Sequence, residues 1–120
     1  LDSSQNATFA GTVSDSKGNL RSIPQQAGGS SRTLVAADAG KHVEMSAGTV
    51  VFPAGAFSTG DAVTIVNSNS SDCSITCSAI TMYLAGDTTA KTSMTLSGRG
   101  MATFLCVGTN QMVGSGGGLS

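Results

Sequence analysis

The clearest pattern in the chain is the alternation of apolar and polar side chains between residues 52 and 77. Val63 and Ile65 flank a threonine, and in residues 73–77 Cys and Ile alternate with Ser and Thr. A period of two places the apolar side chains of a strand on one face. The intervening residues 67–72 are of the types that form turns. This pattern predicts a β-hairpin whose arms each pack one face against a core.

Similar short alternations recur along the chain and are separated by stretches rich in Gly, Ser, Thr and Asp. The most apolar run, residues 101–107, has glycine on both sides and is typical of a strand buried on both faces. The glycine-rich residues 114–120 are expected to be flexible or to pack at a crowded axis. Further strands are predicted at residues 33–36, 41–45, 49–52, 80–84, 94–96 and 111–113.

No window shows helical periodicity, so the pattern predicts an all-β fold: a small antiparallel β-sandwich or a jelly-roll-like barrel. Residues 1–31 differ from the rest in residue pattern, with fewer apolar alternations and many turn-forming residues. Residues 7–13 could form one strand. Further along, Ile23 precedes Pro24, and a residue before proline favours extended backbone. We expect an extended N-terminal arm and linker over residues 1–31 and a β-sandwich domain over residues 32–120. The arm would either lie across a neighbouring subunit or be a flexible leader.

The composition agrees with one small domain made of strands and tight turns. The chain has 120 residues, enough to bury roughly two-thirds of its unfolded surface around one core. Only 4% of the residues are aromatic, so Val, Leu, Ile, Met and Cys must fill that core. Six basic and seven acidic residues nearly balance, which argues against nucleic acid or an anionic membrane as partner. The low charge also favours a subunit held in a larger assembly.

The apolar runs are too short to cross a bilayer. The sequence has no positively charged start followed by an apolar run, so no secretion signal is expected in it. It begins at Leu1 rather than Met, which suggests processing or a piece of a longer polypeptide.

The three cysteines are predicted to be free thiols in the core. On one strand, Cys73 and Cys77 would lie about 13 Å apart, too far for a disulfide. The remaining cysteine is Cys106, and His42 is the one histidine, without a Cys-x-x-Cys spacing. We therefore expect no metal site and no cofactor. Reduced thiols fit a protein that is made and assembled in a cytoplasm.

The residues do not compose a catalytic site, and we expect a protein that is not an enzyme. A nucleophilic mechanism needs a base beside a Ser or Cys, whereas His42 is expected at the surface of a strand. Most of the acidic residues lie beside Gly, Ser or Ala, where they are expected to cap backbone groups in turns rather than to form a carboxylate pair. The carboxylates considered for such a pair are Asp38, Glu44, Asp61, Asp72 and Asp87, and all of them except Glu44 lie in these turn-like contexts.

Five residues are candidates for binding a partner or a sugar. Arg99 lies between two glycines and is either a structural donor to carbonyl groups or a contact to a partner's carboxylate. The predicted turn supplies Asn67, Asn69 and Asp72, and Tyr83 adds one aromatic ring. Because few aromatic side chains are available to stack on sugar rings, carbohydrate binding is the second choice.

Five blocks of the sequence, taken together, resemble a β-rich module of virion proteins from tailed bacteriophages, especially marine and cyanobacterial ones. The likeness covers about residues 12–119, whereas residues 68–78 depart from the pattern. The blocks are residues 18–24 (GNLRSIP), 33–43 (TLVAADAGKHV), 57–67 (FSTGDAVTIVN), 83–86 (YLAG) and 99–107 (RGMATFLCV).

The resemblance implies a structural domain on the outer surface of a virion, either on a tail fibre or as a protrusion of the head or tail. Its expected partners are other virion proteins and further copies of itself, with a homotrimer favoured, and the host surface as a further partner. Such a protein is assembled in the cytoplasm of the host bacterium. The alternative function is a carbohydrate-binding module that recognises host-surface glycans.

Overall fold

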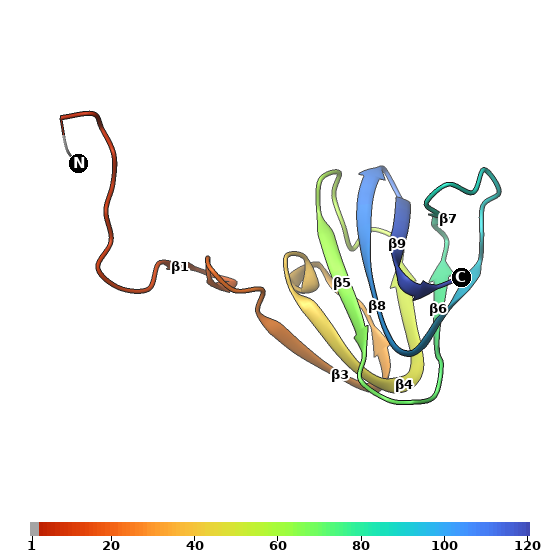
Figure 1. Cartoon of the computed structure of the whole chain (residues 1–120). Helices are drawn as coiled ribbons and strands as arrows, with labels where there is room; N and C mark the ends of the chain where they lie inside the picture. Colours follow the sequence, from red (N-terminus) through yellow and green to blue (C-terminus); the bar gives the residue numbers. More distant parts are fainter. Residues whose placement is uncertain (1–2) are drawn as a thin grey trace.

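The computed structural model describes residues 3–120 and consists almost entirely of strands, which confirms the predicted all-β class (Figure 1). One short 3-10 helix, η1, interrupts the strands at Ala36–Asp38. The strands are β1 (Ser14–Asp15), β2 (Gly18–Asn19), β3 (Gln25–Thr33), β4 (His42–Pro53), β5 (Ala62–Asn67), β6 (Cys73–Ser78), β7 (Thr81–Leu84), β8 (Ser93–Gly108) and β9 (Gln111–Leu119).

The strand pairings close into a mixed β-barrel. β5 pairs with the first part of β4 and the second part of β8, whereas β6 pairs with the second part of β4 and the first part of β8. These four pairings therefore form a closed ring of strands in the order β4, β5, β8 and β6. β3 extends the sheet beside β4, and β9 and then β7 extend it beside β8.

The predicted hairpin between residues 52 and 77 is wrong, because β5 and β6 each pair with β4 and β8 instead. The predicted antiparallel arrangement is also wrong in part: β3, β5 and β6 all run parallel to β4, and β7 runs parallel to β9. Alternation marks which residues face a core, but it is the same for parallel and antiparallel strands. The connections between the strands decide their direction.

β4 and β8 are both long strands that bend in the middle. Ala47 and Gly48 have positive φ angles of 61° and 80°, at the position where the sequence predicted a break. The inward positions of β4 change there from odd numbers (Val43, Met45) to even numbers (Val50, Phe52). The irregularity thus keeps apolar side chains inside on both halves. β8 similarly joins the two strands predicted at 94–96 and 101–107.

The core lies inside the barrel and is built from the inward side chains of all the long strands after β3. Phe52 and Phe104 meet at its centre with ring centroids 4.7 Å apart. Cys73 and Cys106 are buried among these side chains as free thiols, which confirms the predicted core role for both, whereas Cys77 is only partly buried. The other fully enclosed side chains include Val43, Met45, Val63, Ile65, Ile75, Met82 and Leu96.

Three further expectations are corrected by the structure. The strand predicted at 33–36 ends at Thr33, because η1 begins at Ala36. Residues 101–107 are not buried on both faces: Met101, Leu105 and Val107 point outward and are 57%, 43% and 42% exposed. The glycine-rich tail is not flexible coil but β9, paired with β8. Gly116 fits there because a Cβ would lie 2.2 Å from the Met101 carbonyl oxygen.

The N-terminal arm leads away from the barrel (Figure 1). The chain is 52 Å long and 31 by 24 Å across, and its radius of gyration is 16.0 Å, whereas a compact domain of this length has roughly 14 Å. The expected boundary at residue 31 falls inside β3, so the extended part is shorter than predicted. Residues 7–13 do not form a strand. Residues 1 and 2 of the predicted arm lie outside the described residues.

Gly48→Ala should destabilise the fold by at least about 2 kcal/mol, because an alanine there is strained at a positive φ and its Cβ would lie 1.8 Å from the Ser30 carbonyl oxygen. The matched control is Gly117→Ala, which meets nothing within 4 Å and should change the free energy of unfolding by about 0.5 kcal/mol or less. Urea denaturation measures both. Equal effects of the two substitutions would contradict the proposed role of the β4 bend.

Candidate functional site

Four of the five candidate binding residues gather where the β5–β6 connector crosses the bend of β8. We call this region, residues 67–72 and 97–99, the polar corner. The backbone N–H of Arg99 donates to the Asn69 carbonyl oxygen at 2.9 Å. The N–H of Gly98 donates to the Asp72 carboxylate at 3.2 Å. The sequence therefore identified residues that do lie together, although in a corner rather than in a hairpin turn.

Asn67 is completely buried, and its side-chain amide binds only backbone groups. These groups belong to the bend of β4, to the connector and to β8, so one side chain joins three segments. The oxygen Oδ1 accepts from the N–H groups of Ala47 and Asn69, both at 3.2 Å, and Nδ2 donates to the carbonyl oxygens of Ser71, Leu96 and Ser97 at 2.8, 3.2 and 3.2 Å. Asn67 is thus committed to the fold and offers no polar group to a ligand.

The geometry at Arg99 favours the structural interpretation of this residue. Its guanidinium Nη1 donates to the Ser68 carbonyl oxygen, and its backbone has a φ of 63° at the bend of β8. The rest of the side chain remains exposed. Tyr83, the fifth candidate, lies on β7 and is paired in register with Val113 of β9, so it belongs to a different part of the barrel.

The turn-capping role expected for the aspartates is confirmed at three positions. The Asp61 carboxylate accepts from the Ser58 N–H and the Asp87 carboxylate from the Thr89 N–H, both at 2.9 Å. The pKa of Asp87 is lowered first by this backbone hydrogen bond and then by its hydrogen bond with Lys91. The third capping residue is Asp38, which accepts from the Val35 N–H, whereas Asp72 accepts from the N–H of the distant Gly98 in β8. Glu44 instead accepts from the Ser68 hydroxyl.

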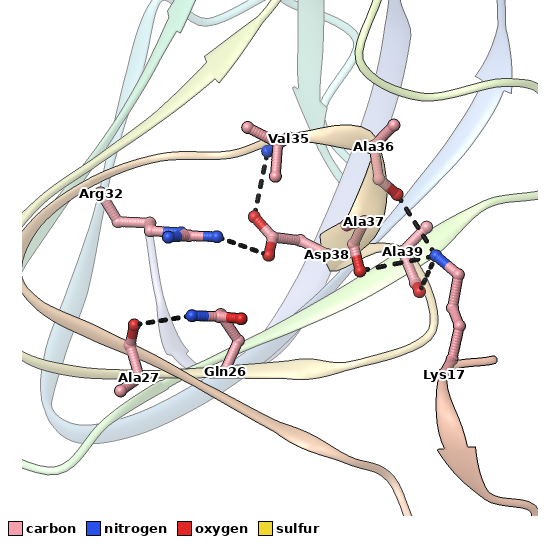
Figure 2. A network of polar contacts seen from close by, with 9 residues as sticks. All are labelled: Lys17, Gln26, Ala27, Arg32, Val35, Ala36, Ala37, Asp38 and Ala39. Atoms are coloured by element: carbon pink, nitrogen blue, oxygen red, sulfur yellow. Dashed lines mark hydrogen bonds and ion pairs between the residues drawn. The ribbon is translucent and has the colours of Figure 1, made fainter.

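A second polar cluster surrounds η1 (Figure 2). The carboxylate of Asp38 is fully buried and accepts from Nη2 of Arg32 at 2.7 Å and from the Val35 N–H at 3.0 Å. Both partners are needed because an unpaired buried carboxylate is costly. The ion pair fixes η1 against the end of β3.

Lys17 attaches the arm to this cluster. Its amino group donates to the carbonyl oxygens of Ala39 at 2.9 Å and of Ala36 at 3.3 Å, as Figure 2 shows. A surface pocket of about 300 Å³ lies beside it, between the arm and Gly40. Because the amino group of Lys17 is already bound to carbonyl oxygens, it is not available there to attract an anion.

His42 is hydrogen-bonded to neighbouring segments, and two of the cysteines have raised pKa values. The ring nitrogens of His42 lie 3.0 Å from the Ile23 carbonyl oxygen and 3.0 Å from Oε1 of Gln25, so the ring contacts the arm and β3. Burial raises the pKa of the Cys73 and Cys77 thiols, which disfavours the reactive thiolate. Within residues 3–120, no three His, Cys, Asp or Glu side chains gather as metal ligands would.

The alternation pattern did not reveal an apolar surface on the outside of the barrel. We call it the outer apolar face, formed by the outward side chains of β5, of residues 101–107 of β8 and of β9, and by Tyr83. Strand register aligns Val66 with Met101 in one row. Another row runs from Ala62 through Leu105 and Val113 to Tyr83.

A row of hydroxyl side chains separates these two rows, and Thr64 and Thr103 share a hydrogen bond of 2.8 Å within it. Glu44 and His42 of β4 and Arg99 of β8 border the outer apolar face. The face was missed because residues 101–107 are apolar at nearly every position, so their pattern does not distinguish an exposed side from a buried one. Within residues 101–107, Thr103 is the one polar side chain that could have indicated which side of the strand is exposed.

Residues 3–120 include no helix that is long and apolar enough to span a membrane. A scan against models of protein families gives no match to this chain, and a search of curated proteins gives none either.

Asn67→Ala should destabilise the protein by about 3 kcal/mol, because it leaves several buried backbone groups without partners. Asn69→Ala is the matched control. It removes one exposed hydrogen bond to Ser71 and should cost about 1 kcal/mol or less. Chemical denaturation monitored by circular dichroism compares them. A similar cost for both would show that Asn67 does not hold the corner together.

Lys17→Met should release the arm without unfolding the barrel. Amide hydrogen exchange should become faster at Leu20, whose N–H donates to Val13, and at His42, whose N–H donates to Pro24. Global stability should change by about 1 kcal/mol or less, since the lost bonds are largely exposed. Lys91→Met, which breaks the ion pair with Asp87, should leave exchange at Leu20 unaltered. Unchanged exchange in the Lys17 variant would contradict the attachment of the arm through Lys17.

Proposed function

We propose that this chain is a non-enzymatic structural module of a bacteriophage virion, displayed on a tail fibre or on a protrusion of the head or tail. Its function is to bind other virion subunits, including copies of itself, and the host surface. It is assembled in the host cytoplasm and ends on the outside of the particle.

The observation that carries this proposal is that three of the resembling sequence blocks are neighbours in space. Residues 57–67 and 99–107 contain the paired stretches of β5 and β8. Residues 33–43 adjoin them, because the Gly40 N–H donates to Ala62 and the Thr64 N–H donates to Lys41. Blocks far apart in the sequence thus form one continuous part of the barrel, as expected if the resemblance reflects a shared folding unit.

The chemistry of the surface supports a role in assembly. The outer apolar face has no charged side chain within it and exposes Met101 at 57% and Leu105 at 43%. Exposed apolar side chains gathered on one face of a small domain are typical of interaction surfaces. The polar corner, in contrast, uses its hydrogen-bonding groups to hold the fold.

A carbohydrate-binding module remains the second candidate, with less support. Asn67 is buried and fully hydrogen-bonded, and Tyr83 lies on β7 away from the polar corner. Neither residue is placed to form one sugar site with Asn69 and Asp72.

Antibodies raised against the purified chain should label intact phage particles at a fixed external position in electron micrographs. Antibody absorbed beforehand with the chain should give no label. Labelling confined to the cytosol of infected cells, with bare particles, would refute the proposal. A glycan array that showed strong binding by the purified chain, together with unlabelled particles, would favour the second candidate.

A further inference from the structure

Within residues 3–120, the exposed large apolar side chains are concentrated in two places. Three lie on the N-terminal arm and three on the outward side of β8, and the remaining one lies just before η1. They are Phe9, Leu20 and Ile23 at 62%, 61% and 61% exposure, Met101, Leu105 and Val107 at 57%, 43% and 42%, and Val35 at 47%. Most of the large apolar side chains that the barrel leaves uncovered thus lie on the arm and on the outward side of β8.

Residues 3–13 of the arm and the outer apolar face are alike in lacking charged side chains. Residues 3–13 contain no Asp, Glu, Lys, Arg or His, and the outer apolar face has none within it. At the centre of this face, away from Glu44, His42 and Arg99 at its border, a charged side chain of a partner would lose its hydration without gaining an opposite charge. An uncharged, extended segment carrying an aromatic side chain has no such cost, and the arm around Phe9 is a segment of this kind.

The arm is also long enough to extend across the barrel of another copy, and it leads away from its own barrel. Residues 3–13 span up to about 36 Å when extended, and the shorter dimensions of the chain are 31 and 24 Å. Lys17 holds the base of the arm against η1, and from there the arm leads away from its own barrel (Figure 1). Another copy's barrel is then the surface that the arm would meet.

We propose that residues 3–13 of one copy dock on the outer apolar face of a second copy, with Phe9 against Met101 and Leu105. This inference rests on the proposed role in assembly and names the surfaces that perform it. The contact joins two different surfaces, so it is head-to-tail, and head-to-tail contacts close into rings when the rotation allows it. A ring of three copies would satisfy the homotrimer that the resemblance implies.

Phe9→Trp provides the test, because the chain contains no tryptophan of its own. In the full chain, the emission of the introduced indole should move to shorter wavelength as the protein concentration rises, in step with a rise in mass by analytical ultracentrifugation. Adding Leu105→Ser should keep the emission at the solvent-exposed wavelength and weaken association at least tenfold, equal to about 1.4 kcal/mol. An unchanged circular-dichroism spectrum would show that the Leu105 variant still folds.

Val35→Ser is the matched control, since Val35 is 47% exposed but lies outside the outer apolar face. It should leave both emission and mass unchanged. A short-wavelength emission that did not depend on concentration would mean that the arm folds back on its own barrel, which overturns the proposal. Assembly with the introduced indole still exposed to solvent, or a monomer at every concentration, would overturn it as well. Labelled virions in the antibody experiment would still support the virion role in each of these cases.

Discussion

The barrel depends on the hydrogen bonds of Asn67. Its amide connects the bend of β4 at Ala47 with the end of the first half of β8 at Leu96, and it also holds the connector that leaves β5. If β4 and β8 were straight, β5 and β6 would lie end to end between them, and the four strands would form one open sheet. The bends turn the two halves toward each other, so that the inward side chains of both halves share one core. A buried amide suits this position because it offers both donors and an acceptor to backbone groups that have left the sheet ladder.

Close backbone approach is the second condition for the bends. A Cβ at Gly48 would collide with the Ser30 carbonyl oxygen, and one at Gly98 would lie 2.1 Å from the Ser70 carbonyl oxygen. The polar corner therefore serves the fold, and the surface left for binding is the outward side of fully paired strands, above all β8. The closed circuit of strands holds this outer apolar face in a fixed shape, and the arm attached through Lys17 is the counterpart that we propose for it in a second copy. Low charge would suit the proposed assembly, because surfaces that meet lose their water without leaving charges unpaired.

The sequence by itself determined the class of the fold, most of the strands and much of the core. Alternation at Val63, Ile65 and Ile75 identifies strands with one buried face, because the side-chain period of a strand does not depend on its partner. The capping aspartates could also be predicted, since Asp beside small residues binds backbone N–H groups locally. Of the candidate binding residues, Asn67, Asn69 and Asp72 are neighbours in the sequence, but their meeting with Arg99 and the structural contacts of Asn67 and Arg99 could not be predicted.

Only the tertiary structure decided what these elements do with one another. Pairing partners and strand direction depend on contacts between distant residues, such as Ala62 with Leu105 and Gly48 with Cys73, which no local pattern encodes. The burial of Asn67 follows from the meeting of two bends, so a residue typical of turns became the centre of a polar network. The exposed side of β8 follows from the absence of a further layer over it within the described chain. A local apolar run shows that a strand is apolar, whereas the packing around it decides which side meets water.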